Sequence, residues 1–421
     1  MNITICLGAN IGGTVDASCV KNGNPGVGGT QFCMLQLAHY LNTHGNYKVN
    51  IIAFREFIVE AGINFYLVNS VTSLFETIKE CNTEVLIVKD FSNDIEYKHK
   101  LVSIDIPIVV WTHNYKKSDF CKFVTKSPQI KAQVFVGKQQ YDRYIDDNVI
   151  NKSTYIYNMF TDNTPNVVRE NDSKTVVYMG ALVEGKGFAE LCKIWKGIVN
   201  AVPEAKLIVL GNGKLYGESK LGKYMLADEK YERKFIKYIT DENGHLLPSI
   251  EFLGVIGEGK TEIFRKTSVG VVNPSGQTET FGMGILEMAE AKLPVVTIGK
   301  NGYFDTVQHE KTGILAKNLQ DLQSHIIELL KNSQLNTQYG ESAKVFIKQF
   351  NPELIGKQWD TILREVYNNS FIPTYATPSP PYSNNYKWVR CITRFLRFRL
   401  HLKFIPSFVQ IESILYKILK G

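Results

Sequence analysis

Two glutamates with seven residues between them are the side chains of this sequence best placed to act on one ligand. Glu279 precedes a run of apolar residues at helical spacing and Glu287 lies within it, in the segment VVNPSGQTETFGMGILEMAEAKLPVVT (271–297). Eight positions of loop and helix correspond to about 12 Å at the helical rise. Carboxylates so spaced can hold the two ends of one extended molecule. Two solvated glutamates on an ordinary helix are the alternative.

The start of that helix offers a second kind of chemistry. The pattern predicts a helix from about Phe281 to Ala291, after a loop of Ser, Gly and Thr, and N–H groups at such a start suit a diphosphate. A cation occurs in a comparable place in VVYMGALVEGKGFAEL (176–191), where a strand ends at Gly180 and Lys186 precedes the next helix. That lysine can reach an anion held near its loop. A merely solvated lysine is the alternative.

Together these segments resemble the family 4 (group 1) retaining glycosyltransferases of the GT-B fold, in which a Pro-Ser, a Glu, a Phe-Gly and a second Glu recur in this order before a PVV strand. The resemblance implies that Glu279 faces the sugar of a nucleotide diphosphate donor and that Glu287 binds the ribose hydroxyls. It implies that Lys186 neutralises the leaving diphosphate. Further donor contacts implied by the resemblance come from Thr280, Phe281, Gly282 and Gly180. The sequence departs from the family at Ala181, where an arginine for the same diphosphate is usual.

A glycine-rich stretch near the amino terminus is a looser match. In NGNPGVGGTQF (22–32), Gly26, Gly28 and Gly29 come before a predicted helix. Glycines there permit positive φ angles and close approach of the backbone to a ligand. The stretch resembles the family's GG-x-E loop, with Gln31 in place of the glutamate, which implies that Gly28 and Gly29 contact the donor. A tight turn is the alternative, since a glycine cluster is a weak signal.

A histidine at the end of a predicted strand is the third catalytic candidate. WTHN (111–114) puts His113 at the carboxyl edge of a sheet, where α/β proteins bind ligands. In the family a histidine after this strand contacts the donor sugar, so the resemblance assigns that role to His113. A structural histidine is the alternative. A second departure from the family is Lys292, which stands where a glycine normally ends the helix.

The elements that must position these residues follow from the periodicity. Short β-branched runs alternate with helical patterns, which is typical of parallel sheets. One series of strands is expected at 3–7, 49–54, 84–88, 107–112 and 133–136, and a second at 175–179, 205–210, 250–252, 269–273 and 294–297. Because the series restarts, we expect an α/β protein of GT-B type, with two doubly wound, Rossmann-like domains facing a cleft. The expected parts are an acceptor-side domain at 1–165, a nucleotide-sugar-binding domain at 166–352, a closing helix at 353–368, a proline-rich spacer at 369–386 and a basic amphipathic tail at 387–421.

Composition excludes several classes of protein. The chain has 421 residues, 44% of them apolar and 21% charged, which fits two or three globular domains. No apolar run reaches the ~18 residues of a membrane span, and the start lacks the features of a signal peptide, so we expect a cytoplasmic protein. Seven scattered cysteines include no C-x-x-C pair. Eight of the 48 basic and one of the 41 acidic residues lie at 387–421, which leaves 40 of each before it and no reason to expect nucleic acid as a partner.

The tail has two faces at helical spacing. The basic row contains Lys387, Arg390, Arg394, Arg397 and then His401. The apolar stripe beside it contains Cys391, Phe395, Phe398, Leu402 and Ile405, widened by Trp388, Ile392 and Leu396, and a second segment adds Phe408, Ile411, Leu415 and Ile418. A basic face beside an aromatic-rich face is what an interfacial helix needs to lie on an anionic membrane, so peripheral attachment to the inner leaflet is expected. Packing of both helices on the protein body is the alternative.

The resemblance implies a retaining, metal-independent hexosyltransferase. It would move a sugar from a nucleotide diphosphate-sugar to a saccharide or lipid-linked acceptor, in cell-surface polysaccharide synthesis. No D-x-D motif is present, so neither a metal nor a cofactor is expected. Charge that develops on the leaving phosphate would be stabilised by Lys186 and the helix amides. The alternatives are another GT-B enzyme, such as a nucleotide-sugar epimerase or a phosphorylase, and a non-catalytic sugar-nucleotide-binding subunit.

Overall fold

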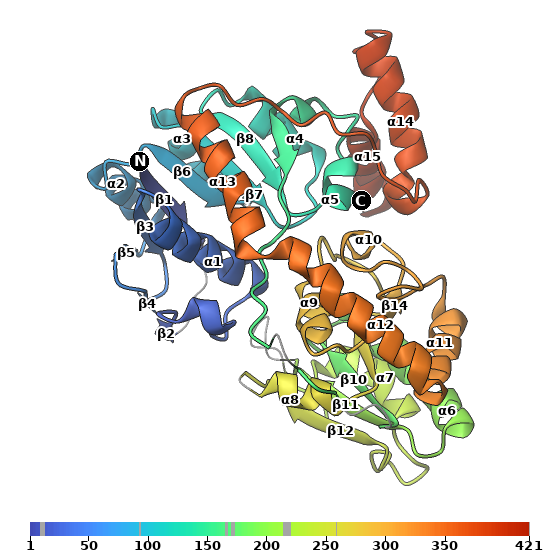
Figure 1. The fold of residues 1–421 in the computed structure, drawn as a ribbon. Coiled ribbons are helices and arrows are strands. Elements are labelled where there is room, and N and C mark those ends of the chain that lie inside the picture. The colour runs from blue at the N-terminus through green and yellow to red at the C-terminus, as the bar shows by residue number, and fades with distance from the viewer. Residues whose placement is uncertain are drawn as a thin grey trace. The chain divides into compact units, whose positions relative to one another are not determined.

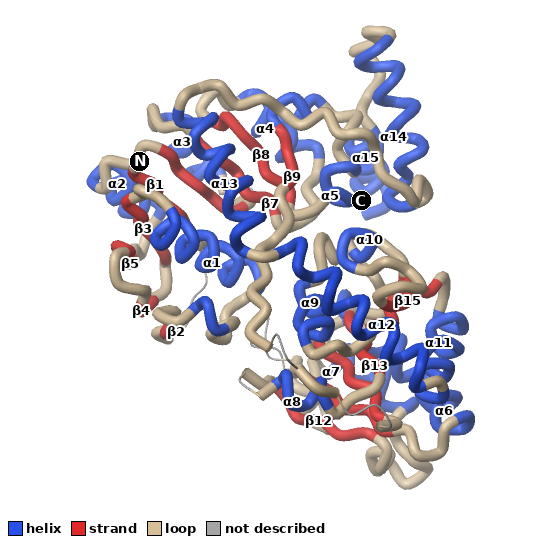
Figure 2. Tube along the Cα trace, viewed as in Figure 1, coloured by secondary structure: helices blue, strands red, loops and turns tan. Residues whose placement is uncertain are grey.

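The chain forms two compact units, each built on one parallel sheet (Figure 1). The computed structural model describes residues 1–8, 13–91, 94–164, 167–169, 173–213, 220–257 and 259–420, without the side chain of residue 420. Unit 1 contains residues 1–161 and 350–421, and unit 2 contains residues 162–349. In each unit the strands form one layer with helices packed against it (Figure 2). The two expected Rossmann-like sheets are therefore confirmed, whereas the expected domain boundary between residues 165 and 166 lies outside the described residues.

Unit 1 has a seven-stranded sheet in the order β5-β3-β1-β6-β7-β8-β9, with all neighbours parallel. Its strands are β1 (Asn2–Cys6), β3 (Lys48–Ala53), β5 (Ile63–Leu67), β6 (Val85–Lys89), β7 (Ile108–Thr112), β8 (Ile130–Phe135) and β9 (Ser153–Tyr155). A separate parallel pair is formed by β2 (Val15–Asp16) and β4 (Phe57–Ile58). The central strands read as continuous apolar runs because both of their faces are covered. In β6, for example, all four residues from Val85 to Val88 are fully buried.

The helices of unit 1 come from both ends of the chain. They are α1 (Gly29–His44), α2 (Val71–Glu80), α3 (Ile95–Ser103), α4 (Ser118–Lys126), α5 (Lys138–Asp142), α13 (Pro352–Tyr367), α14 (Lys387–Arg394) and α15 (Phe408–Lys420). A five-residue π-helical segment, Phe395–Arg399, continues α14. The start of α13 follows from its sequence, because the Asn351 side chain accepts a hydrogen bond from the Leu354 amide and Pro352 needs no partner in the first turn.

Unit 2 has a six-stranded parallel sheet in the order β12-β11-β10-β13-β14-β15. Its strands are β10 (Thr175–Met179), β11 (Lys206–Leu210), β12 (Ile250–Gly254), β13 (Val269–Val272), β14 (Val295–Ile298) and β15 (Gly313–Ala316). Its helices are α6 (Phe188–Ala201), α7 (Glu229–Phe235), α8 (Lys260–Arg265), α9 (Met283–Glu290), α10 (Tyr303–Thr306), α11 (Leu319–Lys331) and α12 (Ser333–Phe346). The strand order reverses between β10 and β13. In doubly wound sheets the loops at the carboxyl ends of such strands form the ligand crevice.

The tail packs on unit 1 with Lys387, Arg390 and Arg397 of its basic row inward, so the expectation that these residues face a membrane is wrong. Lys387 and Arg390 are fully buried, and Arg397 is nearly so. The Lys387 ammonium lies 3.4 Å from Asp142 Oδ2, and the Arg390 guanidinium lies 3.8 Å from Asp146 Oδ1. Burial raises the pKa of Asp146 to about 6. Buried carboxylates need cations beside them, and the basic row of the tail supplies these.

Residues 371–379 of the proline-rich segment form neither helix nor strand, a 3-10 helix follows at Asn384–Tyr386, and the segment is attached to unit 1. The Thr374 amide donates to the Ser153 carbonyl oxygen at 3.0 Å. Further along, both the amide and the hydroxyl of Ser379 donate to Asp142 Oδ2 at 2.9 Å. The segment therefore follows the surface of unit 1 from α13 to α14.

Among the described residues, every helix is too short or too polar to traverse a lipid bilayer.

Candidate functional site

A lysine and a glutamate meet at the carboxyl edge of the unit 2 sheet. Lys186 Nζ lies 3.0 Å from Glu279 Oε2, and both side chains are partly buried. Lys186 follows β10 in a 3-10 turn, and Glu279 lies in the loop between β13 and α9. These strands are neighbours at the reversal of strand order, so their loops share one edge. The structure thus brings together two of the three predicted catalytic residues across 93 positions of sequence.

Contacts between the two loops fix the lysine. Gly187, directly after Lys186, has a φ of +69°, and a Cβ there would stand 2.9 Å from the Ser275 Cβ. The Ser275 hydroxyl donates to the Gly185 carbonyl oxygen at 3.2 Å. From the strand side, the Tyr178 hydroxyl donates to the Lys186 carbonyl oxygen at 2.8 Å. The backbone that carries Lys186 is therefore held from two directions.

The loop that carries Glu279 is held mostly by its own side chains. The Asn273 carboxamide donates to the Gln277 carbonyl oxygen at 2.8 Å, and the Gln277 amide donates to the Ser275 hydroxyl at 3.1 Å. Asn273 and Thr278 both have left-handed backbone conformations, with φ of 37° and 60°. Left-handed non-glycine residues cost free energy and persist where the surroundings fix them, which is common at ligand sites.

The helix after this loop begins two residues later than expected. It starts at Met283 because Gly282 has a φ of +98°, which no residue inside a right-handed helix adopts. Thr280 and Phe281 are buried directly before it. The three predicted diphosphate contacts, Thr280, Phe281 and Gly282, therefore form the approach to the helix instead of its first turn.

Glu287 lies on α9, and its partner was missed from the sequence. Lys260 Nζ lies 2.7 Å from Glu287 Oε2, and both side chains are partly buried. Lys260 is the first residue of α8, directly after Gly259, whose φ of +92° lets the chain turn into the helix. Neither a motif nor the spacing drew attention to Lys260. The only signal in the sequence was a lysine shortly after the β12 strand.

Gly180 lies where the chain leaves β10, in close contact with the end of β11. Its amide donates to the Leu210 carbonyl oxygen at 3.0 Å. A Cβ on Gly211 would overlap the Gly180 carbonyl, so the two chain segments touch through their backbones. Ala181 is buried directly after it. The residue type that departs from the family thus stands at the start of the loop that carries Lys186.

His113 lies at the carboxyl edge of the unit 1 sheet, directly after β7. It is buried, and its ring contacts that of Trp111 with 4.7 Å between centroids. Burial, helped by the positive charge of Lys89, lowers the pKa of His113 to about 3. The imidazole is therefore neutral at physiological pH, and in this form one ring nitrogen donates a hydrogen bond while the other accepts one.

The glycines at the start of α1 partly differ from expectation. Gly28 has an ordinary φ of −62° and Gly29 is the first helical residue, so neither needs a positive φ. Only Gly26 has one, at +87°. A Cβ on Gly28 or Gly29 would meet open space, which leaves room for another molecule close to the backbone.

The predicted site residues thus fall into two groups. Unit 2 contains Lys186, Glu279, Glu287 and the residues at Gly180 and 280–282. Unit 1 contains His113, Gly28 and Gly29. Among the described residues, no cluster of three His, Cys, Asp or Glu side chains is placed to hold a metal ion.

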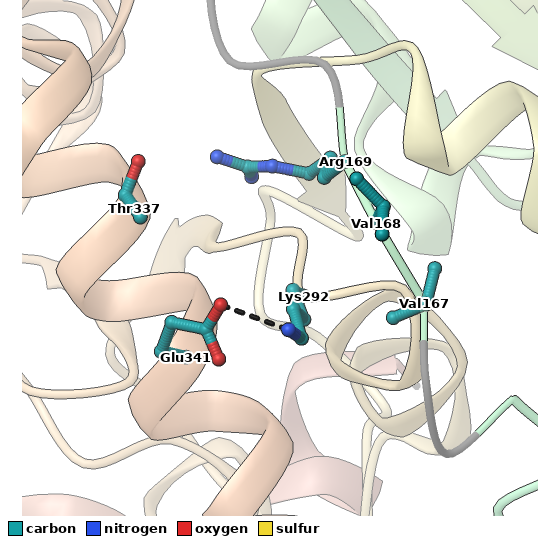
Figure 3. Close-up of a pocket in the computed structure, with 6 residues that line it drawn as sticks. All are labelled: Val167, Val168, Arg169, Lys292, Thr337 and Glu341. Carbon is teal, nitrogen blue, oxygen red and sulfur yellow. Dashed lines mark hydrogen bonds and ion pairs between the residues drawn. The ribbon is translucent and has the colours of Figure 1, made fainter.

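A hollow of about 160 Å³ lies elsewhere in unit 2 (Figure 3). It is lined by Val167, Val168, Arg169, Lys292, Thr337 and Glu341, with Lys292 Nζ 2.9 Å from Glu341 Oε1. Lys292 follows α9 and precedes β14, so the hollow belongs to the amino edge of the sheet, opposite the Lys186–Glu279 edge. Lys292 has a φ of +58°, which is a left-handed backbone conformation. This conformation favours glycine and explains why the family usually has a glycine at this position.

Comparison with known proteins supports the resemblance. Residues 160–346 match the family model described as glycosyl transferases group 1. An uncharacterized glycosyltransferase of Haemophilus influenzae is 23% identical over 365 residues, which cover 80% of this chain and 96% of the relative. The capsular polysaccharide biosynthesis glycosyltransferase CapM of Staphylococcus aureus is 23% identical over 202 residues, which cover 46% of this chain and 48% of CapM.

A solved structure matches across both units. HepE of Anabaena, crystallised in complex with UDP and glucose, has a TM-score of 0.64 at 15% identity, covering 87% of this chain and all of HepE. At that identity the likeness establishes the fold. The expected two-sheet GT-B architecture is therefore confirmed.

Proposed function

We propose that this chain transfers a sugar from a nucleotide diphosphate-sugar to an acceptor hydroxyl, with retention of the anomeric configuration, and the match of residues 160–346 to the glycosyl transferases group 1 model supports this. The observation that carries the proposal is the Lys186–Glu279 pair at the edge of unit 2 where the strand order reverses. A sugar diphosphate offers phosphate oxygens to the lysine and sugar hydroxyls to the glutamate. The ion pair holds both side chains in position before the donor enters.

The roles in unit 2 follow from charge and position. Glu287 would accept hydrogen bonds from the two ribose hydroxyls, while Lys260 holds its carboxylate in place. When the donor binds, the Lys186–Glu279 ion pair would open. Lys186 would then bind the diphosphate, and Glu279 would accept hydrogen bonds from hydroxyls of the sugar. Gly180 and the 280–282 segment would lie against the diphosphate, which requires backbone without bulky side chains in the way.

Catalysis then rests on charge that develops during the reaction. The bond between the anomeric carbon and the phosphate oxygen breaks while the acceptor oxygen approaches from the same face, and the acceptor proton passes to the departing phosphate oxygen. The phosphate becomes more negative in the transition state, so Lys186 stabilises that state more than the ground state. With Ala181 in place of an arginine, Lys186 carries a larger share of this stabilisation.

Unit 1 contributes a neutral histidine and open glycines to the proposal. A buried imidazole that stays neutral can exchange hydrogen bonds with a sugar hydroxyl without adding charge to the site. We assign this role to His113. Gly28 and Gly29 would leave their backbone accessible for contact with the donor.

The similar proteins suggest which donors and acceptors to test first and where in the cell the enzyme would act. HepE was solved with UDP and glucose, so UDP-sugars are the first donors to test. CapM acts in capsular polysaccharide biosynthesis, so we propose a saccharide or lipid-linked acceptor in cell-surface glycan synthesis. The proposed enzyme is metal-independent and works in the cytoplasm at the inner face of the membrane.

A non-catalytic sugar-nucleotide-binding subunit is the second candidate, and the loss of the usual arginine at Ala181 favours it. The two candidates differ in turnover. We expect release of free UDP from a UDP-sugar only when a saccharide or lipid-linked acceptor is present. UDP binding without release, over a panel of UDP-sugars and acceptors, would favour the second candidate. Release that is independent of acceptor would exclude both.

A further inference from the structure

The two C-terminal helices form a hairpin that buries several of its cations and exposes apolar side chains. We define the C-terminal hairpin as residues 387–420, made of α14, the π-helical segment, a loop and α15, on the α5 side of unit 1 (Figure 1). Its basic row is turned inward and is anchored to unit 1. Besides the Asp142 and Asp146 contacts, Arg390 lies 2.8 Å from Glu412 and Arg397 donates to Asn148 at 3.0 Å.

The outward side of the first arm is apolar and aromatic. Trp388, Ile392 and Phe395 are 55%, 54% and 54% exposed, and their spacing places them on one face of the helix. In the loop between the arms Leu400 is 49% exposed and Phe404 is 83% exposed. Large side chains of this kind are normally buried, and several together mark a contact surface.

The second arm adds to the same exposed set. The exposed apolar side chains of α15 are Ile414, Leu415, Tyr416, Ile418 and Leu419. The opposite face of α15 is fixed to the body, since Val409 is buried in the unit 1 core and the Ser118 amide donates to Ser413 Oγ at 3.1 Å. The hairpin therefore presents apolar side chains from both arms and from the loop that joins them.

The charges at this surface select the kind of partner. Arg399, Lys403 and Lys417 are exposed beside the apolar residues, and Lys117 of α4 lies 3.6 Å from the ring centre of Tyr416. The single acidic residue at 387–420 is Glu412, and its carboxylate is held by Arg143 and Arg390. An apolar surface fringed by cations fits a partner that is apolar inside and negative at its surface. An anionic lipid bilayer has these properties.

We propose that the C-terminal hairpin binds the interface of an anionic membrane, with Trp388, Phe395 and Phe404 among the acyl chains and headgroups and the exposed cations at the lipid phosphates. The membrane-facing side is the apolar one, and the buried basic row holds the hairpin in the orientation that exposes it. This inference rests on the proposed placement of the enzyme at the inner membrane face and names the surface responsible. It does not depend on the transfer reaction.

Binding is measured with full-length protein and sedimented vesicles. The test variant is Trp388→Ser/Phe395→Ser/Phe404→Ser, and the matched control is Ile58→Ser/Leu67→Ser, which removes two apolar side chains of unit 1 that are also about half exposed. With vesicles of phosphatidylcholine and phosphatidylglycerol, we expect the test variant to bind about tenfold or more weakly than wild type. We expect the control to bind like wild type.

Varying the lipid and the salt concentration separates the apolar contribution to binding from the electrostatic one. Wild type should bind more weakly to phosphatidylcholine alone and at about 1 M salt than at about 0.1 M salt. The variant Arg399→Gln/Lys403→Gln/Lys417→Gln should lose much of that salt dependence while it keeps residual binding.

Tryptophan fluorescence gives a second readout. Three of the four tryptophans, Trp111, Trp195 and Trp359, are buried in their units, and only Trp388 is exposed. Brominated phospholipids should quench wild-type fluorescence on binding, and Trp388→Phe should abolish this quenching.

Several results would overturn the proposal. One is equal vesicle binding by wild type and the triple serine variant. Another is a wild-type dimer that becomes monomeric in that variant and binds no vesicles, because the hairpin would then join two copies of the chain. UDP affinity, measured on the same proteins, separates this failure from failure of the proposed reaction, since the hairpin variants should bind UDP like wild type.

Discussion

Gly187 and Ser275 lie so close that a Cβ on the glycine would stand 2.9 Å from the serine Cβ and nearer still to its backbone nitrogen. The positive φ of Gly187 adds to the cost of any side chain there. We expect Gly187→Ala to lower the free energy of unfolding by about 1–3 kcal/mol and to weaken UDP-sugar turnover by displacing Lys186. Gly185→Ala is the control, because its nearest neighbour would be the Thr278 hydroxyl at 3.8 Å. Equal melting temperatures for the two variants would contradict the close contact.

Lys186→Ala should lower kcat by about a hundredfold and change KM little, because the lysine acts mostly as the phosphate gains charge. Steady-state kinetics with a UDP-sugar and its acceptor measure this. Lys234→Ala is the control, since Lys234 pairs with Glu184 of the same loop at an exposed position. A rise in KM with unchanged kcat would show that Lys186 binds substrate and transition state equally.

Glu287→Ala should weaken UDP binding by about ten- to a hundredfold, because the charged hydrogen bonds to the ribose are lost. Lys260→Ala should weaken UDP binding less, since the carboxylate remains but is free to rotate. Calorimetry with UDP measures both. If the Lys260 variant loses as much affinity as the Glu287 variant, the lysine itself contacts the nucleotide. Unchanged affinity in a folded Glu287 variant would refute the ribose assignment.

The buried His113 predicts a pH dependence of stability. Its pKa is about 3 in the folded chain and 6.5 as the ordinary value, so on acidification the unfolded chain takes up a proton that the folded chain does not. The stability contributed by neutral His113 is complete above pH 6.5 and falls toward pH 3, by up to about 1.4 kcal/mol per pH unit. His113→Phe removes this proton uptake. Its unfolding free energy should therefore fall less than that of wild type between about pH 7 and about pH 4.5, as measured by urea titration. Parallel curves for the two proteins would contradict the lowered pKa.

The buried cations of the hairpin predict a contrast between two arginines. Arg390→Met should destabilise unit 1 by about 3–5 kcal/mol, since Asp146 loses its cation inside the protein and Glu412 keeps only Arg143. Arg399→Met, at an exposed position of the same hairpin, should change stability by less than about 0.5 kcal/mol. The melting temperatures of the two variants, compared with that of wild type, measure this difference. A small effect of Arg390→Met would mean that water reaches its partners.

The two sheets and the Lys186–Glu279 edge could be predicted because they depend on local signals. Apolar runs between polar loops define the strands, and functional residues directly after strands share the carboxyl edge. The partner of Glu287 could not be predicted, because Lys260 comes from a separate helix and no motif contains it. The sequence predicts the start of α9 two residues too early, because a glycine can begin a helix or, as Gly282 does, prevent it from beginning.

The hairpin shows a different limit of sequence reasoning. Periodicity divides α14 into a basic side and an apolar side, but it does not say which side faces the protein. Normally the apolar side does. Here Asp142 and Asp146, more than two hundred positions earlier, are buried beneath the tail and bind its basic side, although Cys391 and Phe398 of the apolar stripe also pack on the unit 1 core. Long-range charge pairing of this kind leaves no local pattern in the sequence.

The order in which the two units can be completed during synthesis follows from how unit 1 is assembled. Residues 162–349 fold as a continuous insertion, whereas unit 1 needs both residues 1–161 and residues 350–421. Trp111 of β7 packs against Trp359 of α13, with 4.5 Å between ring centroids. During synthesis unit 2 can thus be complete while Trp111 and the aspartates beneath the tail still await their partners. Slow translation or early termination after residue 349 would expose these groups to chaperones and proteases, although unit 2 is already made.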